Sequence, residues 1–352
     1  MPVIRLSTTD PYVNLAIEER ILERAEELGP TLMLWRNEPC VVIGRHQNPW
    51  VECDLAAMRR DALPLVRRIS GGGAVYHDGG NTNFSFIAPS KADPPHAAYD
   101  QERHFRVVID GLARLGIEAW KTDRNDLRVG ERKISGNAFR HTRGRSLHHG
   151  TLLVNANLDL LTAYLSPSGA LIETKATPSV RSTVMNLVEV RPDVTHEMLW
   201  DAIAEAFDAE YGGGGAAPAE AVRDRTVAGA AAAPNDAEHH AAADVAERAA
   251  ELASWEWVYG HTPTFVRRLG MPPAVRRGGD AETPAEIAIT VKKGRIVEVT
   301  SSVSGLADAL IGLRYEQSEL ERAAGEVRTD GANAGEGRLA TAMDLVARSV
   351  YA

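Results

Sequence analysis

The most distinctive stretch of the chain is Arg67-Arg68-Ile69-Ser70-Gly71-Gly72-Gly73-Ala74-Val75-Tyr76-His77-Asp78, in which two arginines precede three glycines and a strand-like run. Glycines let backbone N–H groups approach an anion, and arginine offers a planar fork suited to phosphate or carboxylate. A glycine turn beside two solvated arginines explains the same residues, since the stretch has neither a Walker A lysine nor Rossmann spacing. On this pattern alone, both interpretations stay open.

Short strand-like runs separated by Asn, Pro and Gly surround this stretch. They lie at 32–35, 40–43, 63–66, 74–76 and 83–87. Residues 76–81 contain Asp-Gly-Gly, which predicts a hairpin turn because these residues supply positive φ angles. The other predicted elements are helices at 14–28, 104–115 and 195–209 and a strand at 151–155. Together these elements predict an α+β domain.

The composition changes abruptly after residue 211. Four glycines, Gly212 to Gly215, open an alanine-rich stretch that predicts a linker or insertion over 212–250, with a helix near its end at 241–253. Beyond it, the sequence predicts a hairpin at 286–300 and helices at 305–313, 317–325 and 338–350. We therefore expect a large domain over 1–211 and a small α+β domain over 251–352, which the length of 352 residues allows.

The composition excludes several classes of protein. A formal charge of -9 argues against a protein that binds the phosphate backbone of nucleic acids. The two cysteines, Cys40 and Cys53, provide neither a disulfide framework nor a cysteine-rich zinc site. No signal-peptide pattern and no apolar run of membrane-spanning length occurs, so we expect a soluble protein without nucleic-acid or membrane partners.

Two further clusters carry chemical side chains. In the first, Arg124-Asn125-Asp126-Leu127 precedes Arg132-Lys133-Ile134-Ser135-Gly136-Asn137-Ala138, where Lys133 could face a reacting phosphate or carboxylate. An isolated lysine is more often a surface residue, however. In the second, His148 and His149 enter a predicted strand, and adjacent strand residues point to opposite faces. The two histidines are therefore badly placed to share one metal ion.

The three clusters, in this order and spacing, resemble the lipoate-protein ligase A family within the biotin/lipoate ligase group. The resemblance extends to Asn14-Leu15-Ala16 with Glu18-Glu19, to 41–50 and to 179–187, so it covers most of residues 5–210. Ser254-Trp255-Glu256-Trp257 resembles the entry to the accessory C-terminal domain of the longer ligases. The resemblance implies a mixed sheet flanked by helices, followed by that small accessory domain.

The resemblance also implies a reaction. In this family, ATP activates lipoate as lipoyl-AMP, and the lipoyl group then passes to a lysine of a carrier domain. Lys133 would bridge the lipoyl carbonyl and the α-phosphate in both steps. The implied ATP and adenylate site comprises Arg68, Gly73, Ala74, Val75, Tyr76, Asn125, Asp126 and Lys133. Asp126 is the candidate ligand of Mg²⁺, although Asn and Asp also cap turns.

The remaining implied residues surround the acyl group. Lipoate would contact Ser70, Gly71, Gly72, His77, Lys133 and His149, while a buried structural histidine is an equally good interpretation of His149. A loop containing Lys175, Ser179, Val180 and Arg181 would cover the adenylate and keep water from the anhydride. The implied partners are apo carrier domains of 2-oxoacid dehydrogenase complexes and the glycine cleavage H protein. We expect a monomer in the cytoplasm, or in the mitochondrial matrix if the protein is eukaryotic.

Other functions share parts of this pattern. A lipoyltransferase that takes its acyl group from lipoyl-AMP or a lipoylated protein would carry the same motifs. A cysteine-dependent octanoyltransferase fits poorly, because Cys40 and Cys53 both precede the glycine stretch. Biotin ligases carry a different glycine-arginine motif. A non-enzymatic lipoate-binding protein would be favoured by loss of Lys133 or of the glycines, and all of them are present.

Overall fold

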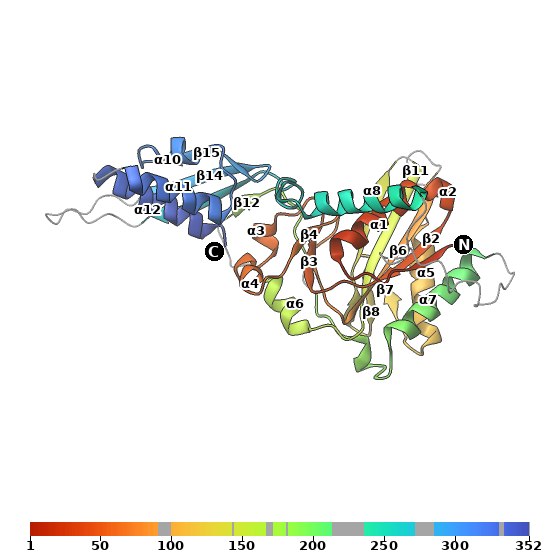
Figure 1. The fold of residues 1–352 in the computed structure, drawn as a ribbon. Coiled ribbons are helices and arrows are strands. Elements are labelled where there is room, and N and C mark those ends of the chain that lie inside the picture. The colour runs from red at the N-terminus through yellow and green to blue at the C-terminus, as the bar shows by residue number, and fades with distance from the viewer. Residues whose placement is uncertain are drawn as a thin grey trace. The chain divides into compact units, whose positions relative to one another are not determined.

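The computed structural model describes residues 1–90, 100–142, 144–166, 172–180, 182–212, 236–271, 285–330 and 334–351. These residues form two compact units, each assembled from three segments of the chain (Figure 1). The first unit comprises Met1–Gly44, Pro64–Thr162 and Val180–Ala253. The second comprises Arg45–Leu63, Ala163–Ser179 and Ser254–Ala352.

A five-stranded mixed sheet forms the centre of the first unit. Its strands, in spatial order, are β1 (Val3–Arg5), β2 (Thr31–Trp35), β6 (Asn81–Ser90), β11 (Gly144–Leu153) and β10 (Asn137–Thr142). β1 and β2 are parallel, and the other neighbours are antiparallel. The register places His149 opposite Ser85 and His148 opposite Phe86. This mixed sheet confirms the predicted fold class.

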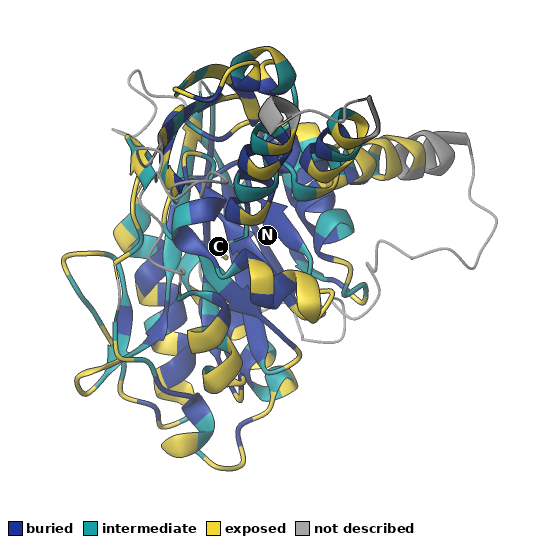
Figure 2. Cartoon of the chain, turned by 90° about the vertical axis from the view of Figure 1, so that its left-hand side faces the viewer, coloured by how far each residue is buried: buried dark blue, intermediate teal, exposed yellow. Residues whose placement is uncertain are grey.

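Apolar side chains cover one face of this sheet. The face presents Leu34, Phe84 and Phe86 to a core that also contains Phe105 of α5 (Gln101–Arg114) and Phe207 of α7 (His196–Tyr211). Figure 1 shows α5 and α7 beside each other on this side. Burial follows the same pattern in Figure 2, where the strands are mostly buried and the helices expose one side to solvent.

The opposite face of the sheet packs against α1 (Pro11–Glu23), followed by α2 (Ala25–Leu28). Asp10 caps α1 by accepting hydrogen bonds from the N–H groups of Tyr12 and Val13, and Pro11 occupies the first turn. The face that α1 buries includes Leu15 and Ile21, but it also includes Glu18, which is fully buried. Burial of an ionisable group requires polar partners, and the sheet supplies them.

Two three-stranded sheets complete the first unit. One has the order β4 (Leu65–Arg67), β3 (Cys40–Ile43) and β5 (Val75–His77), and the other contains β7 (Trp120–Lys121), β8 (Leu127–Val129) and β9 (Arg132–Ser135). The remaining described elements of this part of the chain are α6 (Leu158–Tyr164), the 3-10 turn Leu187–Glu189 and α8 (Asp236–Ala253). The last residues of α6, after Thr162, belong to the second unit.

The predicted hairpin at 76–81 is wrong. β5 pairs with β3, whereas β6 pairs with β2 and β11, so the turn joins strands of two different sheets. Neither Gly79 nor Gly80 has a φ in the left-handed region. Gly80 instead packs against the main chain of Asn155, whose carbonyl oxygen would lie 2.0 Å from an added Cβ. Close approach, rather than a positive φ, therefore requires glycine at this position.

The second unit is built around an antiparallel sheet of β12 (Ile172–Thr174), β13 (Phe265–Met271), β14 (Ala285–Lys292) and β15 (Arg295–Ser301). The β14–β15 hairpin confirms the predicted one, and its turn residues Lys293 and Gly294 both have positive φ. Its described helices are α3 (Pro49–Glu52), α4 (Leu55–Arg60), α9 (Trp255–Val258), α10 (Leu306–Leu310), α11 (Gln317–Asp330) and α12 (Ala334–Ser349). Trp50 packs against Phe265 and Tyr315 in its core.

The compact units differ from the linear division predicted at 211 and 251, because 45–63 and 163–179 join the C-terminal residues. That division stays a prediction. In the predicted linker, residues 213–235 lie outside the described residues, but α8 confirms the helix expected near its end. α8 packs on α1, where Arg248 forms an ion pair with Glu19 at 2.8 Å. Within the described residues, no helix is long and apolar enough to cross a membrane.

Candidate active site

The glycine loop, residues 68–74, connects β4 to β5 and is organised by the side chain of Arg68. The guanidinium donates from Nη2 to the carbonyls of Gly71 and Gly73 at 2.6 and 2.7 Å, and from Nη1 to the carbonyl of Val42 at 3.1 Å. Arg68 is only 5% exposed, and this burial lowers its pKa to about 10. The structure thus places Arg68 inside the loop, where it holds the loop's own main chain.

Gly72 sets the shape of this loop. Its φ of +83° lies in the left-handed region, and an added Cβ would lie 2.9 Å from Nη2 of Arg68 and 3.2 Å from Cβ of Ala138. The loop therefore contacts the start of β10, immediately after the segment that contains Lys133. The first two predicted clusters are adjacent in the fold.

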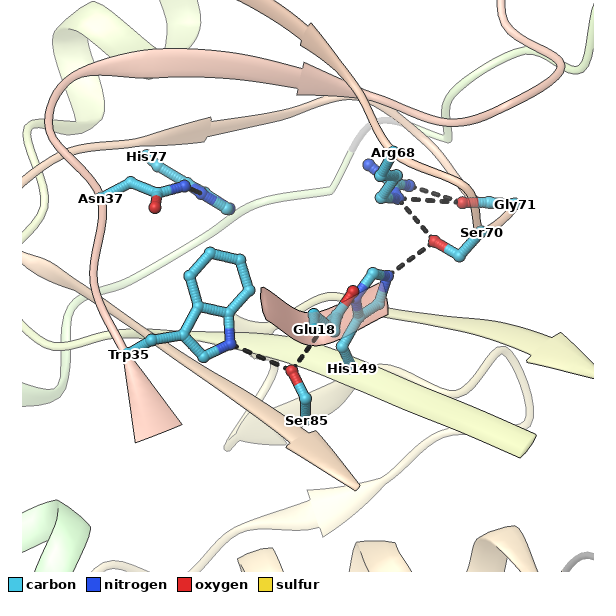
Figure 3. Close-up of polar contacts among 9 residues, drawn as sticks. All are labelled: Glu18, Trp35, Asn37, Arg68, Ser70, Gly71, His77, Ser85 and His149. Atoms are coloured by element: carbon cyan, nitrogen blue, oxygen red, sulfur yellow. Dashed lines mark hydrogen bonds and ion pairs between the residues drawn. The ribbon is translucent and has the colours of Figure 1, made fainter. Parts of the chain in front are cut away.

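A chain of buried hydrogen bonds runs from the glycine loop across β11 to α1 (Figure 3). Arg68 Nε donates to Ser70 Oγ at 3.0 Å, and Ser70 Oγ lies 2.6 Å from His149 Nε2. His149 Nδ1 lies 2.8 Å from Glu18 Oε1. The same carboxylate oxygen accepts a hydrogen bond of 2.6 Å from Ser85 Oγ. These five residues are each less than 9% exposed, so solvent contributes little to the chain.

Trp35 ends the chain, because its Nε1 donates to Ser85 Oγ at 3.0 Å. An indole N–H can only donate, so the hydroxyl proton of Ser85 is left for Glu18. Glu18 Oε2, the other carboxylate oxygen, is buried and has no hydrogen-bond partner among the described residues. The geometry therefore leaves one acceptor of Glu18 facing the interior without a partner.

His77 presents a second buried polar atom of this kind. Asn37 Nδ2 lies 3.0 Å from His77 Nδ1, and Asn37 Oδ1 accepts a hydrogen bond from Asn14, so the amide nitrogen of Asn37 is the donor. Burial lowers the pKa of His77 to about 3, and the ring is neutral with its proton on Nε2. That Nε2 has no partner within the described residues.

The predicted opposite orientation of the two adjacent histidines is confirmed. His148 points to the apolar face, where its ring stacks on Phe139 with centroids 4.5 Å apart and its Nε2 lies 2.9 Å from Asn137 Oδ1. Burial lowers the pKa of His148 well below its ordinary value. His149 points to the α1 face and joins the polar chain. Asn137 thus belongs to the structural support of the site.

The ammonium of Lys133 forms an ion pair with Asp126, with Nζ 2.7 Å from Oδ1. The two side chains are 21% and 15% exposed. The main chain of Lys133 is fixed on both sides, since its N–H donates to Thr183 and its carbonyl accepts from Met185. The backbone therefore holds the lysine at a defined place on β9.

Asn125 and Asp126 form the turn that faces Lys133. Asn125 has a φ of 63°, a conformation that Asn tolerates better than most residues, and its carbonyl accepts from Asn137 Nδ2 at 2.9 Å. The N–H of Asp126 donates to Thr122 Oγ1 at 3.2 Å. These bonds use the main chain of the turn, so the carboxylate of Asp126 is available to pair with Lys133.

A hollow of about 570 Å³ opens beside this turn. Its lining includes the cations Lys121, Arg124 and Arg128 and the carboxylates Asp123, Asp126 and Glu131, and Val180 reaches it from the predicted covering loop. Three cations and three carboxylates lie in this lining, so its formal charges balance. The turn of the second cluster and the end of the predicted loop thus share one surface.

The other predicted residues lie around these centres. Gly73, Ala74 and Val75 are half-buried and lead into β5, where Tyr76 is buried. In the covering loop, Lys175 is exposed, and Ser179 accepts a hydrogen bond from Gln47 at 3.0 Å. Arg181 lies outside the described residues. None of these positions by itself tests the predicted roles, which stay predictions.

Sequence reasoning missed Glu18, Trp35 and Ser85 as parts of the site. The sequence did indicate that Glu18 is buried, because it lies three residues from both Leu15 and Ile21, on the face that α1 buries. A charged residue at such a position needs a buried partner. Both cysteines are buried, and burial raises the pKa of the Cys40 thiol, which argues against a thiolate nucleophile there.

Comparison with known proteins gives consistent results. Residues 10–208 match the model of the lipoyl protein ligase A/B catalytic domain, within the predicted domain of residues 1–211. The lipoate-protein ligase A of Psychrobacter cryohalolentis is 45% identical over 272 residues, which make up 76% of this chain and 74% of that protein.

Solved structures show the same fold. P. falciparum LipL1 in complex with lipoate matches with a TM-score of 0.61, covers 99% of both chains and is 23% identical, a level that supports the fold alone. A lipoate-protein ligase A bound with ATP matches with a TM-score of 0.55 and 26% identity, over 73% of this chain and 98% of its own.

Proposed function

The chain belongs to the lipoyl protein ligase A/B family and is a lipoate-protein ligase, and we propose that Lys133, Asp126 and the glycine loop carry out its two half-reactions. The observation that carries this proposal is Lys133, whose backbone is fixed by hydrogen bonds to Thr183 and Met185 and whose ammonium is paired with Asp126. The relative and the ATP-bound ligase named above support the same chemistry.

The reaction needs activation because a carboxylate has no good leaving group. In the first step, a lipoate oxygen attacks the α-phosphate of ATP, and pyrophosphate leaves. In the second, the ε-amine of a carrier lysine attacks the carbonyl of lipoyl-AMP; the C–N bond forms, the amine loses a proton, and AMP leaves. Both steps build negative charge at an oxygen, so a fixed cation and aligned N–H groups accelerate them.

Lys133 supplies that cation. Its charge is balanced by Asp126, which the ammonium would exchange for the acyl carbonyl and the α-phosphate. Removing one such electrostatic contact costs ~3–4 kcal/mol of transition-state stabilisation in other enzymes. The backbone hydrogen bonds of Lys133 lower the entropic cost of this exchange, because only the side chain has to move.

Mg²⁺ fits this site as a companion of the nucleotide. Among the residues that the structure describes, no group of three or more His, Cys, Asp or Glu side chains could hold a metal ion. Mg²⁺ commonly binds one or two carboxylates together with substrate phosphates, and Asp126 can provide one carboxylate. Such an ion would offset the charge of the triphosphate.

In this proposal, the main chain of the glycine loop borders the nucleotide and the acyl group. Arg68 supports it from within rather than contacting phosphate through a free fork, since both hydrogens of Nη2 are directed to loop carbonyls. Gly73 to Tyr76 then border the adenylate, and Ser70 to Gly72, His77 and His149 border the acyl group.

The covering loop closes the proposed site. We propose that 175–181 orders over the adenylate and excludes water from the labile anhydride. Val180 is 61% exposed, as expected for an apolar residue that becomes covered when substrates bind. Limited proteolysis with and without lipoate plus ATP tests this step, since an unchanged cleavage rate in the loop would contradict it.

The proposal also covers the acceptor proteins, the oligomeric state and the compartment. The acceptors are lysines of apo lipoyl domains in 2-oxoacid dehydrogenase complexes and of the glycine cleavage H protein. The enzyme acts as a monomer in the cytoplasm, and light scattering at assay concentration tests the oligomeric state. Membership of the family supports these acceptors.

One assay separates ligase from transferase. The purified protein is incubated with lipoate, ATP and Mg²⁺, with and without an apo lipoyl domain, while pyrophosphate release and carrier mass are followed. Pyrophosphate and a lipoyl mass gain together support the complete ligase reaction. If pyrophosphate is absent but synthetic lipoyl-AMP still modifies the carrier, the protein is a transferase that cannot activate free lipoate.

A further inference from the structure

One asparagine side chain joins two segments of the proposed site. Asn137 is the first residue of β10 in the five-stranded sheet, two positions after β9 of the smaller sheet ends at Ser135. Its amide nitrogen donates one hydrogen to the carbonyl of Asn125 at 2.9 Å and the other to Oγ of Ser135 at 3.1 Å. The amide therefore ties the turn that carries Asp126 to the strand that carries Lys133.

Every hydrogen-bonding group of this side chain has a partner. The carbonyl of Asn125 can only accept, so the amide nitrogen of Asn137 faces it and Oδ1 faces the other way. That oxygen lies 2.9 Å from Nε2 of His148, which is therefore the donor. Nδ1 of His148 is buried without a partner among the described residues, which agrees with a neutral ring protonated at Nε2. The position thus requires two donors and one acceptor, which an amide provides.

The five-stranded sheet fixes the place of this amide. Gly150 of β11 lies opposite Asn137 in the pairing of β10 with β11. An added Cβ at Gly150 would lie 2.3 Å from Oδ1 of Asn137 and 2.4 Å from Cζ of Phe84. Glycine at this position therefore leaves the space that the asparagine side chain fills, and His148 of the same strand holds its oxygen.

We propose that Asn137 is a positioning residue that holds the turn of Asn125 and Asp126 against β9, so that the carboxylate of Asp126 keeps its place when the ammonium of Lys133 leaves it for the reactants. This inference rests on the proposed function and adds to it a residue that acts through Asp126.

A tether of this kind is needed because the ion pair cannot serve throughout the reaction. The 2.7 Å contact between Lys133 and Asp126 also joins the turn to β9, but in the proposed mechanism the ammonium exchanges this partner in each turnover. The hydrogen bonds of Asn137 are made to neutral groups and survive that exchange. They also hold the carbonyl of Asn125, whose φ of 63° is uncommon for a residue other than glycine.

The two half-reactions should depend on this tether to different extents. Asp126 acts in the proposed adenylation step, beside the triphosphate. Transfer from lipoyl-AMP involves no triphosphate and needs the cation of Lys133, whose main chain is fixed separately by Thr183 and Met185. Loss of the Asn137 amide should therefore slow adenylation much more than transfer.

The variant Asn137→Ala tests this difference. Pyrophosphate release with lipoate and ATP should be ~10-fold slower and the KM for ATP higher, whereas transfer from synthetic lipoyl-AMP should fall less than ~3-fold. Because Asn137 acts through Asp126, the double variant with Asp126→Asn should be no slower than Asp126→Asn alone. Amide hydrogen exchange over residues 121–127, measured without substrates, should be faster in Asn137→Ala.

Two further variants serve as controls. Ser135→Ala removes one acceptor and keeps the bond to Asn125, so it should slow adenylation less than ~3-fold. Thr195→Ala removes the N-cap of α7, away from the tether, and should lower the melting temperature without changing either step. Asn137→Ser should show the same difference between the two steps as Asn137→Ala, and thermal melting checks that all variants are folded.

The outcomes separate this inference from the proposed function. Wild-type rates in Asn137→Ala, equal slowing of both steps, or losses that multiply in the double variant would overturn the inference, while slow adenylation in Asp126→Asn would leave the proposed function intact. Wild-type adenylation in Asp126→Asn would overturn the proposed role of Asp126 and this inference with it.

Discussion

Replacing Gly80 by alanine tests how the junction between β5 and β6 is built. An added Cβ would lie 2.0 Å from the carbonyl oxygen of Asn155, 2.3 Å from its carbon and 2.6 Å from the nitrogen of Ala156. These are main-chain atoms, which cannot move aside as a flexible side chain can. The Gly80 carbonyl also accepts hydrogen bonds from Val154 and Asn155, so any displacement weakens both.

The cost can be worked out from these contacts. Overpacking of a well-packed site costs ~1–3 kcal/mol, and each hydrogen bond contributes ~0.5–1.5 kcal/mol. Gly80→Ala should therefore lower the free energy of unfolding by about 3 kcal/mol. Gly79 is the matched control, because an added Cβ there meets no atom within 4 Å. Gly79→Ala should change the free energy by less than ~1 kcal/mol.

Urea unfolding followed by tryptophan fluorescence measures both variants. The expected result is a much lower midpoint for Gly80→Ala and an unchanged one for Gly79→Ala. Equal destabilisation of the two would mean that positive φ angles, as in a hairpin, are what both glycines provide. That result would refute the close-approach explanation.

Three further predictions concern stability and the metal. Burial lowers the pKa of His104 to about 3. The contribution of the neutral ring to the free energy of unfolding is therefore complete above pH 6.5 and is lost as the pH falls towards 3. In urea titrations, His104→Phe should reduce the fall of the free energy of unfolding over this range by up to ~1.4 kcal/mol per pH unit. Arg248→Ala removes the ion-pair partner of Glu19, which is 14% exposed and whose pKa burial raises to about 7. Because this carboxyl can take up a proton, the variant should cost ~1–2 kcal/mol in the free energy of unfolding. Asp244→Ala breaks an ion pair in which Asp244 is 65% exposed and should cost under ~0.5 kcal/mol; equal costs would contradict the packing of α8 described above. Asp126→Asn should raise the KM for ATP and slow pyrophosphate release about tenfold. EDTA should stop pyrophosphate release without shifting the melting temperature, since no metal cluster occurs among the described residues. A shift of the melting temperature with EDTA would reveal a resident metal.

Local patterns were sufficient to predict most elements of the fold. Periodicity predicted α1, α5 and α7, and the Lys-Lys-Gly segment predicted the β14–β15 turn, where the residues with positive φ were found. Alternation along β11 predicted that His148 and His149 face opposite sides. These are properties of neighbouring residues, and a sequence displays them directly.

Contacts between distant parts of the chain could not be predicted in this way. Glu18 and His149 are 131 positions apart, and only the packing of α1 on β11 brings them together. The Asp-Gly-Gly turn was misjudged for the same reason, because glycine serves close packing as well as positive φ. Likewise, no local signal joins 45–63 and 163–179 to the C-terminal unit.

The central claim is that Lys133 stabilises the charge that develops in both half-reactions. Single-turnover rates of lipoyl-AMP formation and of transfer from synthetic lipoyl-AMP should both fall ~10²–10³-fold in Lys133→Ala. Lys121→Ala, which removes a nearby cation paired with Glu102, should slow transfer far less. A Lys133→Ala protein that is folded and performs both steps at near wild-type rates would contradict the mechanism.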